Sequence, residues 1–193
     1  MKLIIASNNA HKIGEIKKIL SDSFDSILSL REAGIDHETV EDGTTFMENA
    51  KKKAREIAEI SGCAALADDS GICVDALGGA PGIFSARYAG EHGNDEANNK
   101  KLLFDLLGKD DRSAHYTAAM ALIFPDGEEV LAEGYMYGSI ISSPRGNGGF
   151  GYDPLFVPVG EERTVAEMSA EEKNAISHRA NALKELMIKL SKR

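Results

Sequence analysis

The sequence contains no tryptophan and only two cysteines, and its longest apolar runs are a few residues long. Cys63 and Cys73 form no CxxC pair and lack metal-ligand spacing, which favours two reduced thiols over a disulfide or a zinc site. Runs such as Leu3–Ala6 and Ala118–Phe124 are too short to span a bilayer. The first residues also lack a signal-peptide pattern, so we expect no membrane association and a cytoplasmic location.

Positive charge is scarce as well. The chain has 22 Lys and Arg residues against 31 Asp and Glu residues, which gives a net charge of −9. Nucleic-acid backbones are bound by basic faces, so this balance argues against a nucleic-acid-binding module. It does not exclude a phosphate-bearing small molecule, because that needs only a local cationic pocket or a metal ion that bridges carboxylates to phosphate.

The residues that are present predict an α/β protein. The 193 residues, 42% of them apolar, fit a single domain over 1–193 or two small lobes that share a core. Strand–helix units beside a central hairpin indicate a mixed sheet with flanking helices. The expected strands cover 3–6, 27–30, 64–67, 72–74, 115–124 and 129–141, and the expected helices follow residue 9 and residue 45 and cover 94–107 and 180–190.

The segment Ser7–Lys12 lies between a buried strand and a helix. A strand-to-helix turn exposes backbone N–H groups at the positive end of the helix dipole, which favours anion binding, and Lys12 adds a charge. The alternative interpretation is a simple helix cap by Ser7 or Asn9.

Asp68 and Asp69 are adjacent carboxylates that follow an apolar strand and precede Ser70-Gly71. Neighbouring side chains of a strand point to opposite faces, but a turn at Gly71 would let both enter one pocket. Such a pair suits Mg²⁺ ligation and proton abstraction from water, and Glu41-Asp42 upstream could supply a further ligand. The alternative is a turn in which Asp caps its own backbone.

Two segments near the C-terminal end also suggest ligand binding. Gly146–Pro154 has four glycines within six residues, which allow close backbone approach, and Phe150 and Tyr152 offer aromatic faces for a base. His178 and Arg179 are expected in the first turn of the last helix, where cations are unfavourable unless they meet an anion or a carbonyl. A charged, solvated face is the alternative for this second segment.

Taken together, these segments resemble the inosine triphosphate pyrophosphatase family, enzymes that remove dITP, ITP and XTP from the nucleotide pool. The resemblance runs in order along essentially the whole chain. It rests on Ser7–Lys12, Thr45–Ala50, Ala67–Gly71, Gly78–Gly82 with Ser85–Tyr88, Gly148–Pro154 and Glu172–Arg179.

The resemblance implies a two-lobed α/β fold around a central mixed sheet, an active site in the inter-lobe cleft and a homodimer. It also implies Mg²⁺-dependent hydrolysis of the triphosphate to a monophosphate and pyrophosphate. Asp69 matches the general base, and Glu41, Asp68 and Asp69 match the metal site. The residues that match substrate-binding positions are Ser7, Asn8, Asn9, Ala10, His11, Lys12, Lys53 and Ser70 for the triphosphate, and Phe150, Gly151, Tyr152, Asp153, Lys173, His178 and Arg179 for the base.

Two alternatives stay open from the sequence. The first is a pyrophosphatase for another modified or pyrimidine nucleotide, which a substrate panel would separate from the main hypothesis. The second is a sensor that binds a nucleotide without hydrolysis. The carboxylates Glu41, Asp68 and Asp69 argue against the sensor, because a pure binder gains little from carboxylates beside a triphosphate.

Overall fold

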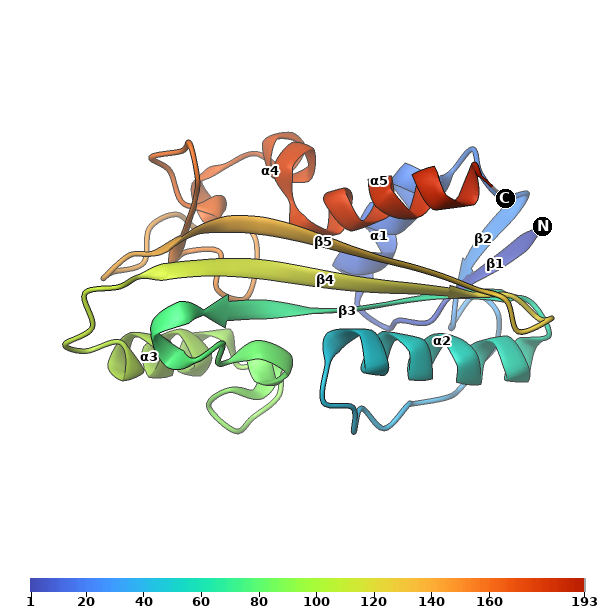
Figure 1. Ribbon diagram of the computed structural model, residues 1–193, viewed down its shortest axis with the longest axis horizontal. Coiled ribbons are helices and arrows are strands. Elements are labelled where there is room, and N and C mark those ends of the chain that lie inside the picture. The colour runs from blue at the N-terminus through green and yellow to red at the C-terminus, as the bar shows by residue number, and fades with distance from the viewer. Residues whose placement is uncertain (193) are drawn as a thin grey trace. The chain divides into compact units, whose positions relative to one another are not determined.

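The computed structural model describes residues 1–192, and its six-stranded sheet has the order β2-β1-β3-β4-β5-β6. β1 pairs in parallel with β2 and β3, whereas β6 pairs antiparallel with β5, so the predicted mixed α/β sheet is confirmed. The strands are β1 (Lys2–Ile5), β2 (Ser26–Ser29), β3 (Ala64–Val74), β4 (Ser113–Ile123), β5 (Glu129–Ile140) and β6 (Phe156–Pro158). The helices are α1 (Ala10–Leu20), α2 (Phe46–Ser61), α3 (Asp95–Asp105), α4 (Ala170–Ile176) and α5 (His178–Leu190), with short 3-10 turns η1 (Asp75–Leu77), η2 (Gly82–Arg87) and η3 (Val165–Glu167) (Figure 1).

The chain forms two compact units. The first unit comprises Met1–Asp69, Ala118–Gly134 and Arg179–Arg193, and the second comprises Ser70–Thr117 and Tyr135–His178. The three long strands β3, β4 and β5 therefore contribute residues to both units. No helix within residues 1–192 has the length and apolar character needed to cross a membrane.

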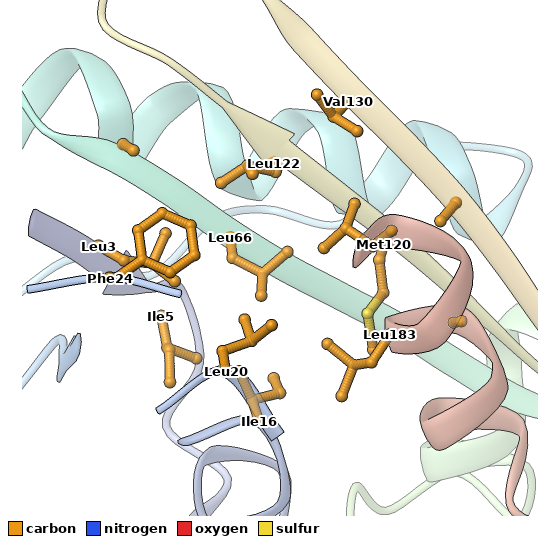
Figure 2. Close-up of a cluster of buried hydrophobic side chains, with 14 of the residues drawn as sticks. Leu3, Ile5, Ile16, Leu20, Phe24, Leu66, Met120, Leu122, Val130 and Leu183 are labelled. Carbon is orange, nitrogen blue, oxygen red and sulfur yellow. The ribbon is translucent and has the colours of Figure 1, made fainter. Parts of the chain in front are cut away.

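The first unit is packed on both faces of its strands. Leu3 and Ile5 of β1 lie in a core with residues of α1 and α5, among them Leu20 and Leu183 (Figure 2). Ile4, between them in sequence, lies in a second core with Ala50, Ala54 and Ile57 of α2. This follows from the alternation of side chains along a strand, and it places α1 and α2 on opposite faces of β1.

This arrangement produces a topological switch at the carboxyl end of β1, where the neighbouring strand β3 continues. β1 continues through α1 to β2 on one side, and β2 continues through α2 to β3 on the other side of β1. Ligands of open α/β sheets bind where successive connections diverge in this way. The register Ile5↔Leu66 brings the segment after β1 beside Asp68.

α2 begins directly after Thr45, which confirms the helix predicted to follow residue 45. Thr45 Oγ1 accepts a hydrogen bond from the backbone N–H of Glu48 at 3.1 Å. The helix then buries Ala50, Ala54 and Ile57, the apolar face expected from the 3.6-residue period. α2 is thereby fixed against β1 and β3, and it carries Asn49 and Lys53 on its next turns.

The turn expected at Asp68–Gly71 is not formed. β3 runs without interruption from Ala64 to Val74, so the two strands predicted here are one. β3 is a central strand with β1 and β4 as neighbours, and backbone pairing within the sheet outweighs the local turn preference of Asp-Ser-Gly.

The second unit has its own core. Tyr152 and Phe156 pack there with Ile72 of β3, Leu102 of α3 and Tyr116 of β4. α3 covers these strands and ends three residues before Gly108, whose positive φ of 71° is readily adopted only by glycine.

Candidate active site

The segment after β1 closes onto the start of α1. Asn9 Oδ1 accepts hydrogen bonds from the backbone N–H groups of His11 and Lys12, at 3.0 and 3.2 Å, and Ser7 Oγ accepts one from Asn9 N–H at 3.1 Å. The capping interpretation is therefore correct for Asn9. Asn8 and His11 are exposed and Ala10 is the first residue of α1, so a ligand can approach this segment from solvent.

Asp68 and Asp69 point to opposite faces of β3. Asp68 shares the α1/α5 face with Leu66, whereas Asp69 shares the α2 face with Ala65 and Ala67. This is the regular alternation of a strand, and it gives the two carboxylates different partners and different electrostatics.

Asp68 is surrounded by cations. Lys12 Nζ lies 2.8 Å from Oδ1, and Arg179 Nε donates a hydrogen bond to Oδ2 at 3.1 Å. Burial raises the pKa of Asp68, but the charges of Lys12 and Arg179 outweigh this effect and hold the pKa well below its usual range. Arg179 also donates to Glu15 Oε2 at 2.5 Å. A lowered pKa favours the ionised form of Asp68, which pairs with Lys12 at the start of α1.

Asp69 has an environment of the opposite kind. It accepts a hydrogen bond from Asn49 Nδ2 at 3.1 Å, and Lys53 Nζ lies 3.5 Å from its other oxygen. Lys53 also donates to Glu41 Oε1 at 2.6 Å. Burial is the largest influence on Asp69 and raises its pKa, with Lys53 opposing the shift and Glu41 adding to it. A raised pKa makes this carboxylate a better proton acceptor than an ordinary aspartate.

The structure brings only part of the predicted metal site together. Within residues 1–192, no three His, Cys, Asp or Glu side chains are arranged to hold a metal ion by themselves. Glu41 and Asp69 both approach Lys53, whereas both oxygens of Asp68 face cations. Mg²⁺ commonly takes one or two carboxylates and completes its shell with phosphate oxygens and water, so the pair Glu41 and Asp69 fits this ion.

A second cluster surrounds the glycine-rich segment of the second unit. Lys173 Nζ donates to Asp153 Oδ2 at 2.7 Å and lies 4.5 Å from the centre of the Phe150 ring. The same Asp153 oxygen accepts a hydrogen bond from Phe150 N–H at 3.0 Å. A side chain at position 149 would collide with Asp153, since a Cβ there would lie 2.1 Å from Oδ2. Glycine at this position therefore permits the tight loop.

His178 belongs to this second cluster. It opens α5, as predicted, and its ring stacks on Tyr116 with centroids 4.8 Å apart. Tyr116 in turn donates to Asp153 Oδ1 at 3.4 Å. Arg179, which the resemblance also groups with the base-binding residues, lies beside Asp68.

Three further residues that the resemblance places in the substrate site are Tyr152, Gly151 and Ser70. Tyr152 is only 3% exposed and donates its hydroxyl hydrogen to the Ser85 carbonyl at 2.8 Å, so its ring supports the loop from the core. Gly151 is bound through its backbone to α3. Ser70 is half-buried and follows Asp69 in β3.

Sequence reasoning missed several residues of both clusters. Asn49 was included only within a family motif, and Glu15, Tyr116, Asp95 and Asn99 carried no signal. Each acts through a partner distant in sequence, which no local pattern identifies. The exception is Asn49, because its spacing of four residues from Lys53 places both on one face of α2.

Comparison with known proteins gives consistent results over nearly the full length. The sequence model of the Ham1 family matches residues 3–189. The dITP/XTP pyrophosphatase of Clostridium perfringens is 53% identical, with 96% of this chain and 95% of the relative covered. The dITP/XTP pyrophosphatase of Streptomyces coelicolor is 48% identical, again with 96% of this chain and 95% of the relative covered.

Solved structures agree with the sequence comparison. The Ham1 protein of Staphylococcus aureus has a TM-score of 0.91 and 41% identity, with 99% of this chain and 98% of that chain covered. A HAM1 protein from Coxiella burnetii has a TM-score of 0.92 and 39% identity, with both chains fully covered. The resemblance seen in the sequence motifs is thereby confirmed.

Proposed function

The chain belongs to the Ham1 family, and from this premise we propose that it hydrolyses the non-standard purine nucleotides dITP, ITP and XTP to the monophosphate and pyrophosphate. The observation that carries this proposal is the environment of Asp69. It is a buried carboxylate with a raised pKa, and it lies beside a lysine and a second carboxylate, in the part of β3 that continues past the carboxyl end of β1.

Phosphate binding is proposed for the first unit. Lys53 and Lys12 supply positive charge, and the exposed segment at the start of α1 supplies backbone N–H groups at the positive end of a helix dipole. Asp69 accepts a proton from the attacking water, and Asn49 holds the carboxylate in place. Fixed cations around the phosphates stabilise the charge that develops in the transition state.

Mg²⁺ is the proposed cofactor, held by Glu41 and Asp69. When bound, it would neutralise phosphate charge and orient the triphosphate. Asp68 also matches the metal site of the family, but its two cationic partners would have to release it first. Chelation with EDTA is expected to abolish hydrolysis, and added Mg²⁺ to restore it.

Base selection is proposed for the second unit. Phe150 offers an aromatic face, and the ammonium group of Lys173 beside it is a pure hydrogen-bond donor. Hypoxanthine and xanthine carry a 6-oxo acceptor, whereas adenine carries an amino donor at that edge. A donor left unpaired against adenine disfavours ATP.

A panel of nucleoside triphosphates with Mg²⁺ tests the proposed function, with both pyrophosphate and orthophosphate followed. Pyrophosphate from ITP, dITP and XTP, with little from ATP, is the expected result. Orthophosphate release or equal use of ATP would contradict it. Preference for a different modified nucleotide would favour the alternative of a pyrophosphatase with another substrate. Binding of ITP without turnover would favour a nucleotide sensor that does not hydrolyse its ligand.

The Lys173→Ala variant is expected to lose about tenfold of its preference for ITP over ATP, because a charged donor is removed from the base-binding cluster. Lys100→Ala is the matched control, since Lys100 is an exposed lysine of the same unit that pairs with Glu96. The measurement is kcat/KM for both nucleotides. An equal loss for ITP and ATP would place Lys173 on the phosphates instead.

The family resemblance further suggests a homodimer that acts in the cytoplasm, where the nucleotide pool is located. Sedimentation of the purified protein measures the first of these proposals directly. A monomer at assay concentration would contradict it.

A further inference from the structure

Two side chains of α3 hold both backbone polar groups of Gly151. Asp95 Oδ2 accepts a hydrogen bond from Gly151 N–H at 2.6 Å, and Asn99 Nδ2 donates one to the Gly151 carbonyl at 2.8 Å. Asp95 and Asn99 are four residues apart and therefore lie on the same face of the helix. We call this pair of contacts the α3 clamp.

The α3 clamp acts next to the residue proposed to stack on the base. Gly151 follows Phe150 directly, in a segment that belongs to no strand or helix. Without ladder partners, the backbone groups of such a segment must be bound by side chains or water. Phe150 is thus fixed on one side by its bond to Asp153 and on the other by the α3 clamp on Gly151.

The helix that carries the clamp is itself anchored. Asn94 caps its first turn by accepting a hydrogen bond from Ala97 N–H at 3.1 Å. Asn98, only 1% exposed, accepts one from Ala89 N–H at 2.8 Å and donates to the Ala86 carbonyl at 3.3 Å. These contacts fix α3 to η2 and the residues after it, so the clamp presents its two side chains from a rigid support.

We propose that Asp95 and Asn99 are positioning residues for base recognition, which hold the Phe150 ring and Lys173 in the geometry that accepts a purine. The proposal rests on the function proposed above. It assigns to α3 a role in substrate affinity and selectivity, while Asp69 and Lys53, in the first unit, carry out the chemistry.

The contacts of Asn99 favour positioning over simple stabilisation of α3. Its Oδ1 atom is buried and has no hydrogen-bond partner within residues 1–192, which costs free energy. The amide orientation is set by the Gly151 carbonyl, which can only accept. The amide of Asn99 therefore serves the loop through its hydrogen bond to Gly151, and in the part of the chain that the structure describes it does not cap or brace α3 itself.

The test compares Asp95→Leu and Asn99→Leu with Glu96→Leu. Glu96 is an acidic residue of the same first turn, but it is exposed and pairs with Lys100. Losing a strong hydrogen bond to the loop is expected to raise KM for ITP about tenfold and to leave kcat within about twofold. Asp95→Asn keeps an oxygen that can accept from Gly151 N–H, so it is expected to restore most of the affinity.

Hydrogen exchange of the loop without nucleotide gives an independent readout. The amides of 148–153 are expected to exchange faster in Asp95→Leu and Asn99→Leu than in the wild type or Glu96→Leu. Unchanged exchange and unchanged KM would overturn the inference, as would a fall in kcat at constant KM. If Asp95→Leu fails to fold, Asn99→Leu still decides the question, because it removes the other hydrogen bond of the α3 clamp. The two proposals can also fail separately. If the Leu variants exchange faster but the wild type does not prefer ITP, the proposed function is contradicted and the positioning role of the α3 clamp is not.

Discussion

The Asp69→Asn variant is expected to bind ITP nearly as well as the wild type and to lose turnover by roughly 10²–10⁴-fold, the usual effect of removing a general base. The substitution preserves the shape of the side chain, and the new amide oxygen can still accept a hydrogen bond from Asn49. What it removes is the ability to accept a proton from water and the negative charge with which Asp69 is also proposed to hold Mg²⁺. Single-turnover kinetics and a separate measurement of nucleotide binding distinguish a loss of turnover from a loss of affinity.

Asp42→Asn is the matched control for this variant. Asp42 is exposed, pairs with Lys52 and lies one residue after Glu41, so the substitution removes the same charge from the same unit without touching Asp69. Its turnover is expected to remain close to that of the wild type. Near-normal turnover of Asp69→Asn would show that another group accepts the proton, and equal losses in both variants would indicate a general effect of charge.

The second large effect is expected from Asp68→Leu, which should lower the free energy of unfolding by about 3–5 kcal/mol. Asp68 is only 2% exposed and neutralises Arg179, which is itself 2% exposed. Removal of the carboxylate takes away the ion pairs that Arg179 and Lys12 each form with Asp68. Urea unfolding of both proteins measures the difference.

The Arg179→Met variant completes a double-mutant cycle with Asp68→Leu. If the buried charges depend on each other, the double variant should be more stable than the sum of the two single losses predicts, because it buries neither of the two charges without the other. Strictly additive losses would contradict a direct pair. Lys17→Met is the control, since it removes a cation from the more exposed pair with Glu32.

The contribution of Asp68 should also depend on pH. Although burial raises its pKa, the charges of Lys12 and Arg179 lower it to well below the usual range in the folded protein. The stabilisation is therefore complete above the pKa of Asp68 in the unfolded chain and is lost as the pH falls through the folded-state pKa. The stability difference between the wild type and Asp68→Asn should shrink in acid.

The sequence by itself determined the local features of this protein. The helix that follows residue 45 and the central hairpin of residues 115–124 and 129–141 were predicted from local patterns, and both are formed, as α2 and as β4 with β5. The order of the motifs also pointed to the family. These signals are local, because capping, turn formation and periodicity depend on residues a few positions apart.

The tertiary structure alone decided how the site residues are partnered. Asp68 and Asp69 were expected in a turn between two short strands, yet pairing of β3 within the sheet keeps them in one strand and directs them to opposite faces. Arg179 reaches Asp68 across 111 positions, and Asn99 reaches Gly151 across 52. Such contacts depend on strand register and helix packing, which bring together residues that no local pattern connects.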